Sequence, residues 1–166
     1  EEKLSDEGQK KALTKDARAV LEDVLAGKRA GRKAYILLAP AFMGQYKDVK
    51  TGQIRNAFRK MGFDGLVEVA LFADILTLKE ALEFDRNIQS ESDYMLTSCC
   101  CPMWVAMIKK SFRHLMPHVP PSVSPMIAAG RTVKKLYPDA LTVFLGPCMA
   151  KKTEAKDPDL VGAIDH

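Results

Sequence analysis

The chain has 166 residues, of which 47% are hydrophobic and 28% are charged, a balance typical of one globular domain. This composition excludes a disordered or collagen-like chain, and no apolar run approaches the length of a transmembrane helix. The polar N-terminal residues do not form a secretory signal. The net charge of +4 comes from basic residues scattered among 21 acids, with few aromatics, and this pattern argues against nucleic-acid binding.

The first third of the chain predicts a helix, a buried strand and a second helix. Apolar residues repeat at three- and four-residue spacing through the first segment, and Ser5 and Gly27 are suited to cap its two ends. The continuous apolar run over residues 33–40 predicts a strand buried on both faces, which stops at its proline. A helix is expected over residues 51–61, with apolar side chains on one face.

The alternation of strands and helices continues through the rest of the chain. Further strands are expected over 66–75, 94–98 and 141–145, and further helices over 76–88, 102–115 and 126–136. This order predicts an α/β fold, with a parallel four-stranded sheet and helices on both faces. We expect a single α/β domain over residues 1–166, on which the helical segment 1–32 packs. The tail from Asp157 has no obvious terminating element, so we expect the chain to be a piece of a longer protein.

The four cysteines follow two of the expected strands. Cys99, Cys100 and Cys101 are consecutive, and Cys148 comes directly after the last strand. Ligands of a parallel sheet bind beyond the carboxyl ends of its strands, so we expect all four thiols at one edge of the sheet. This clustering favours metal or redox chemistry in a reducing, intracellular setting over a disulfide framework.

Thiolates suit zinc, copper(I) and iron–sulfur clusters, and the spacing discriminates among these. A zinc site needs four close ligands, whereas nothing near Cys148 supplies a second one. An iron–sulfur cubane also takes four cysteines, and side chains of adjacent cysteines diverge, so at most two of the three consecutive cysteines are expected to ligate. Free cysteines are often buried as small hydrophobic residues without any chemical role. Three consecutive cysteines before a proline at the end of a strand make that explanation improbable.

Two segments resemble signature loops of the [FeFe]-hydrogenases. Residues 97–104 (TSCCCPMW) resemble the first loop, and residues 144–154 (FLGPCMAKKTE) resemble the second. The segment Ala39-Pro40-Ala41 resembles a weaker family element beside the di-iron site. The resemblance extends over residues 33–154. It implies an H-cluster, in which a [4Fe-4S] cubane is joined to a di-iron unit with carbon monoxide and cyanide ligands, and reversible reduction of protons to hydrogen.

The resemblance also implies a role for several residues. Cys101 and Cys148 would ligate the cubane, Cys100 would pass protons to the di-iron unit, and Lys151 would donate to a cyanide ligand. An ammonium offers three donors to such an anion. These roles follow from aligning the first loop on its proline. An alignment on Thr97 instead shifts every role in that loop by one residue.

Other residues receive weaker assignments. Glu80 and Glu83 share one face of their helix and resemble the proton-pathway glutamates of the family, and a solvated acidic face is the alternative. The positions that the resemblance places around the cofactor are Ala39, Pro40, Pro102, Ser124, Pro125, Pro147 and Glu154.

The chain also departs from the family pattern. The third cysteine loop is missing, so the piece supplies two of four cubane ligands, and we expect it to bind the cluster weakly and to be inactive alone. Gly146 replaces a usual methionine, and residues 118–121 lack a relay serine. These departures resemble the divergent, sensory hydrogenases, and we expect slow turnover.

The resemblance implies a cytoplasmic protein and an electron-transfer partner such as a ferredoxin or an accessory iron–sulfur domain. No membrane or nucleic-acid partner is expected. An apolar face where the missing lobe would dock predicts a homodimer.

Two other functions compete with the hydrogenase hypothesis. The first is an iron–sulfur carrier of the cytosolic assembly machinery with the same fold, although such a carrier needs neither Cys100 nor Lys151. The second is a flavodoxin-like domain that binds a nucleotide or flavin, which requires a glycine-rich loop after the first strand. That loop has only Gly44.

Overall fold

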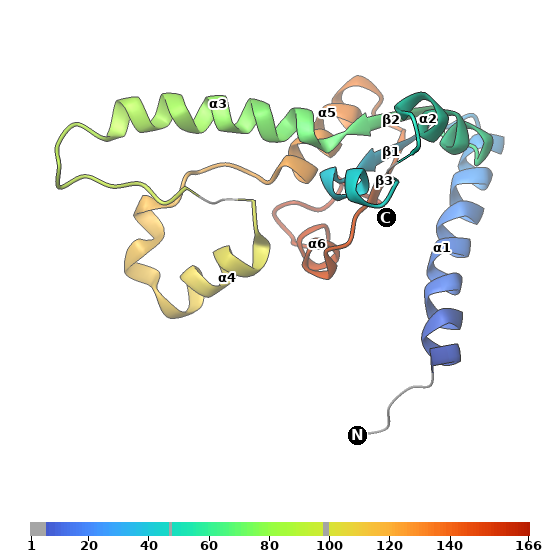
Figure 1. The fold of residues 1–166 in the computed structure, drawn as a ribbon, viewed down its shortest axis with the longest axis horizontal. Coiled ribbons are helices and arrows are strands. Elements are labelled where there is room, and N and C mark those ends of the chain that lie inside the picture. Colours follow the sequence, from blue (N-terminus) through green and yellow to red (C-terminus); the bar gives the residue numbers. More distant parts are fainter. Residues whose placement is uncertain (1–5, 47, 98–99) are drawn as a thin grey trace.

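The computed structural model describes residues 6–46, 48–97 and 100–166 of the chain (Figure 1). Its centre is a parallel sheet in the order β2-β1-β3, with β1 at Ala34–Leu38, β2 at Gly65–Glu68 and β3 at Leu141–Leu145. Tyr35 of the central strand lies opposite Gly65 on one side and Thr142 on the other. All three strands therefore end at the same edge of the sheet.

Helices connect the strands and follow them. The α-helices are α1 (Asp6–Arg29), α2 (Thr51–Lys60), α3 (Val69–Asn87), α4 (Pro102–Ser111), α5 (Pro125–Leu136) and α6 (Met149–Glu154), and the short 3-10 helices are η1 (Pro40–Gly44) and η2 (Arg113–His118). None of the helices in the described part of the chain combines the length and the apolar character that a membrane crossing requires.

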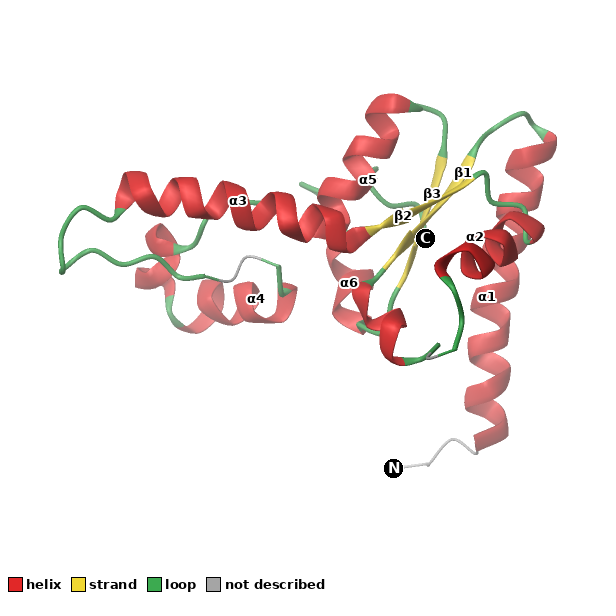
Figure 2. Cartoon of the chain, turned by 45° about the horizontal axis from the view of Figure 1, so that its top comes forward, coloured by secondary structure: helices red, strands yellow, loops and turns green. Residues whose placement is uncertain are grey.

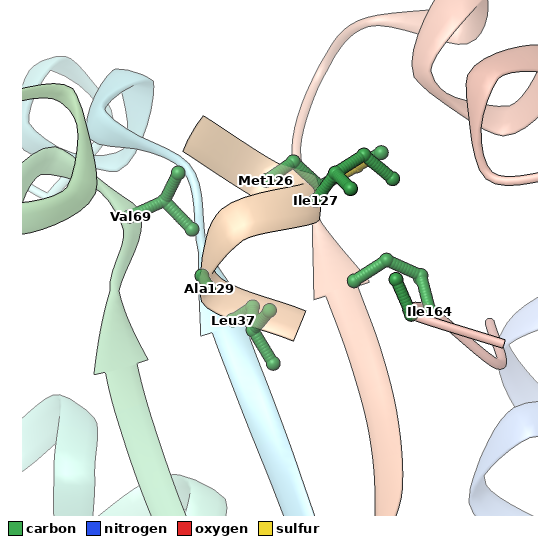
Figure 3. Packing of buried hydrophobic residues seen from close by; sticks show 7 residues of the cluster. Leu37, Val69, Met126, Ile127, Ala129 and Ile164 are labelled. Carbon is green, nitrogen blue, oxygen red and sulfur yellow. The ribbon is translucent and has the colours of Figure 1, made fainter. Parts of the chain in front are cut away.

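Apolar side chains cover both faces of the sheet because successive residues of a strand point to opposite sides. On the face covered by α5, Leu37 packs with Met126, Ile127 and Ile164 (Figure 3). The opposite face is covered by α1 and by the segment after α2, and its core residues are Val24, Ala34, Ile36, Phe63, Leu141 and Val143. The predicted α/β class with helices on both faces is confirmed.

The described residues form a sheet of three strands, so the prediction of four is wrong. Residues 94–97 are irregular, and Ser98 lies outside the described residues. The N–H of Leu96 donates to the carbonyl of His118 (2.8 Å), which is not part of a strand. The predicted strand over 66–75 is also too long, because α3 begins at Val69. A continuous apolar run fits a buried strand and a helix equally well, and here most of it is helix.

The predicted helix boundaries are correct to within one residue at α2 and α5. They are wrong at α1, at α3, which begins at Val69 and not at residue 76, and at α4, and α6 was not predicted. Gly27 does not end α1 but lies inside it, where a Cβ would come 2.6 Å from a methyl carbon of Leu141. The helix ends at Arg29, and Gly31 supplies the positive φ of 77° that turns the chain. The predicted cap Ser5 lies outside the described residues. The predicted helix over 102–115 divides into α4 and η2.

The molecule consists of a sheet body and an arm. The helix α3 starts at the sheet and runs away from it, and the chain then returns to α4 beside it (Figures 1 and 2). We call α3, α4, η2 and the segment 88–97 the arm, and the sheet with α1, α2, α5 and α6 the body. Cys101, at the start of α4, thus belongs to the arm, and Cys148, at the start of α6, belongs to the body.

Candidate metal centre at the carboxyl edge of the sheet

The ends of β1 and β3 lie side by side at the carboxyl edge of the sheet. The N–H of Ala39 donates to the carbonyl of Leu145 (2.9 Å), which continues the pairing one residue beyond β1. Ala39, Gly146 and Pro147 line a cavity of about 190 Å³ together with Phe42 of η1. Three of the residues expected near a cofactor on sequence grounds, Ala39, Pro40 and Pro147, therefore lie on adjoining segments at this edge.

The space around Gly146, between Phe144 and Ala39, is too narrow for a side chain. A Cβ at this position would lie 2.7 Å from the ring of Phe144 and 3.0 Å from the Cβ of Ala39. The methionine that the family resemblance leads us to expect here would displace the Phe144 ring. The glycine is thus part of the packing between the two strand ends.

Two of the thiols each precede a helix. Cys101 is the N-cap residue of α4, and Cys148 is the N-cap residue of α6, both with extended backbone. Both side chains are exposed, as is that of Cys100, whereas Cys99 lies outside the described residues. The helices α4 and α6 contact each other. The two cysteine segments, far apart in sequence, are therefore held by neighbouring helices.

Lys151 joins these two segments directly. Its Nζ atom donates to the backbone carbonyl of Cys100 and to the Oε2 atom of Glu154, both at 2.7 Å. The side chains of Lys151 and Glu154 are only 14% and 10% exposed. A charge pair removed from water in this way is costly to break, because the remaining partner stays buried and unpaired. The pair therefore fixes the cysteine loop of the arm onto α6 of the body.

A larger cleft lies between the arm and the body. It has a volume of about 640 Å³ and is mostly apolar, and its walls come from α4, η2, residues 119–124 and α6. Pro102, Ser124 and Glu154, three predicted cofactor residues, all line it. The hydroxyl of Ser124 is buried and accepts from the N–H of Ile127 (3.5 Å), so it caps α5, which begins at Pro125.

The predicted glutamate pair lies on α3, in the arm. Glu83 is not part of a solvated face, because its side chain is only 19% exposed and its Oε1 atom accepts from Lys79 Nζ at 2.7 Å. Its Oε2 atom is buried and has no hydrogen-bond partner in the described part of the chain. Lys79 also donates to the hydroxyl of Ser122 (2.7 Å). Glu80 lies on the same helix and is partly buried.

Sequence reasoning missed Lys79. This residue connects α3 to the segment that leads to Ser124, and it orients the carboxylate of Glu83. Its spacing of four residues from Glu83 is the signal that could have found it, because residues four apart share a helix face.

The described residues supply only part of a cluster site. Nowhere in the described ranges do three histidine, cysteine or acidic side chains gather as a metal would require. A [4Fe-4S] cluster takes four cysteine ligands, and the described part of the chain has three exposed thiols, Cys100, Cys101 and Cys148. Cysteine thiolates are suitable ligands for an iron–sulfur cluster, but the described residues supply fewer than the four that a [4Fe-4S] cluster needs. This edge can hold one side of a cluster whose other ligands come from elsewhere.

Comparison with known proteins gives one consistent result. Residues 32–166 match the family described as iron only hydrogenase large subunit, C-terminal domain. Iron hydrogenase 1 of Clostridium pasteurianum is 31% identical over 126 residues, which cover 71% of this chain and 22% of that protein. The cytosolic Fe-S cluster assembly factor NAR1 of Yarrowia lipolytica is 27% identical over 103 residues, or 57% of this chain and 20% of that protein.

A solved [FeFe]-hydrogenase, studied for oxygen inactivation through modification of its H-cluster 2Fe subcluster, has the same fold. The TM-score is 0.70 at 26% identity, and the match covers 90% of this chain and 44% of that one. The chain spans less than a third of the length of the curated relatives named above. The match over residues 32–166 shows that the chain belongs to the family formed by the C-terminal domains of iron-only hydrogenase large subunits.

Proposed function

We propose that this chain forms part of an [FeFe]-hydrogenase catalytic domain, which interconverts two protons and two electrons with one molecule of hydrogen. The observation that carries the proposal is the contact of Lys151 with the carbonyl of Cys100. It unites the two cysteine segments, which a domain with unrelated chemistry would have no need to join. Family membership supports the same function.

The cysteines and Lys151 take separate roles in this proposal. Cys101 and Cys148 would hold the cubane from the arm and from the body, and the Sγ atom of Cys100 would carry a proton at the site. Lys151, held by Glu154, has a further N–H with which to bind an anionic cyanide ligand. When bound, the H-cluster supplies the metal site and the electron transfer. The remaining ligands would come from the part of the family's proteins that this chain does not span.

Glu83 and Glu80 serve proton transfer in the same proposal. The partly buried carboxylate of Glu83 has one oxygen bound to Lys79 and the other without a partner in the described part of the chain. That second oxygen is the atom that we propose to take up a proton. Lys79 holds the carboxylate in place, since it is fixed at the same time to Ser122.

The departures from the family pattern lead us to propose a slow, hydrogen-sensing variant. A methionine at position 146 would require the ring of Phe144 to move, so the surroundings of a di-iron unit here would differ from those that the family resemblance leads us to expect. Turnover of the intact parent protein at metabolic rates would contradict the sensory role.

Two partners belong to this proposal. In this proposal, electrons come from an iron–sulfur partner such as a ferredoxin. The exposed leucines of α3, Leu71, Leu78 and Leu82, mark the face through which two copies of the chain would dimerise. A monomer in light scattering would exclude the dimer.

The alternative function is that of an iron–sulfur carrier, and the similarity to a cluster assembly factor favours it. In a carrier, Cys101 and Cys148 keep their role as ligands, while Cys100 and Lys151 have no chemical task. The two functions therefore differ in which substitutions affect them.

Iron and acid-labile sulfide per chain, measured after anaerobic reconstitution, test the proposal. We expect weak iron binding by this chain and stoichiometric binding by a longer form that carries the third cysteine loop of the family. In that longer form, Cys101→Ser and Cys148→Ser lower the iron content. Tight binding by this chain alone, unaffected by both substitutions, would overturn the assignment of the ligands.

A second measurement separates the enzyme from the carrier. Cys100→Ser in the longer form leaves the iron content unchanged and lowers hydrogen turnover by two or more orders of magnitude, which is the range for a lost proton-transfer group. A carrier shows no hydrogen turnover at all, and Cys100→Ser then has no effect on cluster transfer to an apo-acceptor.

A further inference from the structure

The edge of the sheet at which the strands begin lies opposite the candidate metal centre. Three segments lead into the strands there: residues 28–33 into β1, residues 59–64 into β2 and residues 134–140 into β3. In Figure 2 the loops before β1 and β3 lie at the other end of these strands from α6. We call the three segments together the basic face, because lysine and arginine dominate them.

Contacts between the segments make the basic face one surface. The side chain of Arg32 donates to the carbonyl of Asp139 (2.8 Å). The Nζ atom of Lys28 donates to the carbonyl of Gly62 (3.5 Å). The segments before β2 and β3 are therefore each joined to the segment before β1.

The charge of the basic face exceeds that of the whole chain. Its segments contain eight lysines and arginines against two aspartates, which gives +6, whereas the whole chain carries +4 and the rest of it therefore carries −2. One of the eight cations is neutralised from outside the face, because Lys134 pairs with Asp165 at 2.7 Å. A charge of +5 remains at this one edge of the molecule.

Helix dipoles do not account for this charge. The helices α1, α2 and α5 end at the basic face with basic residues in their last turns, where cations oppose the partial negative charge of the helix end. That partial charge is about half an elementary charge per helix, or about −1.5 for the three. Within the described ranges, no ion pair joins a cation of the face to Asp64 or Asp139. Most of the positive charge is therefore open to a partner.

Apolar side chains protrude between these cations. Leu136 follows Lys135 at the end of α5 and is 67% exposed, and Met61 follows Lys60 at the end of α2 and is also exposed. A basic surface with single aliphatic side chains is typical of binding to an anionic bilayer. Lysine and arginine there reach the lipid headgroups, and the aliphatic side chains enter the boundary of the acyl region.

We propose that the basic face binds the surface of a membrane rich in anionic lipid. Such a contact needs no membrane-spanning helix, and it departs from the expectation, drawn from the sequence, that the chain has no membrane partner. The strands lead away from the face, and the five residues of β1 span about 17 Å. The candidate metal centre, at the other edge of the sheet, therefore stays open to the solution. The inference holds whatever cofactor that centre binds.

The basic face is less suited to nucleic acid. Proteins that bind single strands offer aromatic rings on which bases stack. Within the three segments the exposed aromatic residue is Tyr137, and its ring is already stacked on Tyr35 with centroids 5.1 Å apart. The Nζ atom of Lys33 also lies 4.2 Å from the centre of this ring. An acidic protein is the competing partner that the test has to separate from a membrane.

Co-sedimentation with vesicles tests the proposal. Vesicles of phosphatidylcholine with about one third phosphatidylserine are compared with vesicles of phosphatidylcholine alone, at about 0.1 M and about 0.5 M salt. We expect the chain to bind the anionic vesicles at low salt, to bind them more weakly at high salt, and not to bind the phosphatidylcholine vesicles. Absence of binding to the anionic vesicles at low salt would overturn the proposal.

A triple variant of the basic face locates the contact. Arg29, Lys60 and Lys135 lie one in each segment, are exposed, and have no side-chain partner among the described residues. A basic residue near an anionic surface strengthens binding by about fivefold, so replacing all three by glutamine is expected to weaken vesicle binding by about a hundredfold.

A second triple variant is the matched control. It removes the same charge from exposed residues elsewhere: Lys110→Gln, Arg113→Gln and Lys156→Gln. We expect its vesicle binding to stay within about threefold of the wild type, because salt screens charges that lie far from the bilayer. All six side chains are exposed, so the urea midpoints of both variants are expected to match that of the wild type. An equal loss of vesicle binding in both variants would show a response to net charge alone and would overturn the proposal.

Leu136→Ala separates a membrane from an acidic protein. A leucine that enters the bilayer loses buried carbon atoms when it is shortened, so we expect binding to the anionic vesicles to weaken by about tenfold. Binding to poly-L-glutamate, a soluble polyanion, is expected to change by less than about twofold, since its attraction is electrostatic. Unchanged vesicle binding by Leu136→Ala would show that the face responds to acidic groups alone. It would assign the face to an acidic macromolecule and overturn the proposal.

Discussion

The body and the arm use apolar residues in opposite ways. In the body, Leu37 and Ile127 are fully buried between the sheet and α5. In the arm, Leu78 and Leu82 of α3 are 69% and 60% exposed, although their residue type is the same. The sheet therefore supplies most of the stability of this chain, and the arm depends on a few ties to the body. The site lies where the two regions meet. Its rigidity therefore depends on the few contacts between arm and body, such as the hydrogen bond from Lys151 to the carbonyl of Cys100.

A matched pair of leucine substitutions tests the contrast most strongly. Leu37→Ala removes a fully buried side chain of β1, and we expect a loss of about 2–5 kcal/mol in the free energy of unfolding. In the monomeric chain, Leu78→Ala on α3 changes this free energy by less than about 0.5 kcal/mol, because the side chain of a single copy is mostly in water already. Urea denaturation measures both. Equal losses would show that α3 is covered in solution and that the arm is not an open structure.

Two glycines sharpen the comparison within the body. Gly130 of α5 lies against the segment that carries Ala163, and a Cβ would come 2.3 Å from the Ala163 carbonyl oxygen. We expect Gly130→Ala to destabilise the chain by about 1–3 kcal/mol through this clash. Gly52 of α2 has open space around it, so Gly52→Ala is expected to be neutral or stabilising by up to about 1 kcal/mol. Urea denaturation of both variants is expected to show a lower free energy of unfolding for Gly130→Ala and an equal or higher one for Gly52→Ala.

Asp165 makes the stability of the body dependent on pH. Burial acts to raise the pKa of Asp165, but the hydrogen bonds from Lys134 and Thr142 outweigh it and lower the pKa below its ordinary value. A lowered pKa in the folded state stabilises the chain above the unfolded pKa of about 4, and this stabilisation is lost as the pH falls below it.

We therefore expect Asp165→Asn to cost about 1–2 kcal/mol at pH 7. This is less than the roughly 1.5–3 kcal/mol of a hydrogen bond to a fully buried charge, because Asp165 is partly exposed and asparagine keeps one acceptor oxygen. The difference between wild type and variant shrinks between pH 4 and pH 2. Urea midpoints at pH 7 and pH 3 measure it. A difference that stays constant over this range would mean that the carboxylate charge does not stabilise the fold.

Much of the body could be predicted from the sequence. The apolar runs before Pro40 and Gly146 predicted β1 and β3, because strands of a parallel sheet that are buried on both faces are almost continuously apolar. The same rule wrongly predicted a strand over residues 69–75, which belong to α3. The apolar residues of this segment do not recur at a clear helical spacing, so the sequence pattern did not identify it as a helix. The packing of this segment in the folded chain, which cannot be read from the sequence, determines that it is helical.

The sequence singled out the residues of the candidate site, but their connections could not be predicted. The expected strand before Cys99 is absent from the described residues, so only Cys148 directly follows the end of a strand, and the roles of the cysteines and of Lys151 stay predictions. The contact of Lys151 with the Cys100 carbonyl joins a side chain to a backbone atom 51 residues away, and no sequence pattern encodes such a pairing. The link from Lys79 to Ser122 was missed for the same reason.

The smallest expected effect is in the loop at the far end of the arm. The Oδ2 atom of Asp93 accepts from the N–H groups of Gln89 (3.0 Å) and Ser90 (2.8 Å), and these bonds lower the pKa of its exposed carboxyl group. We expect Asp93→Ala to accelerate the exchange of the Gln89 and Ser90 amides and to leave the global urea midpoint unchanged, since local openings of the arm do not require the sheet to unfold.

The wild type shows the same faster exchange, relative to the intrinsic rate at each pH, when the pH falls through the lowered pKa of Asp93. Glu91→Gln in the same loop is the control, and we expect it to leave the exchange of both amides unchanged. A shift of the global midpoint by Asp93→Ala would show that arm and body unfold together, and the distinction between them would then fail.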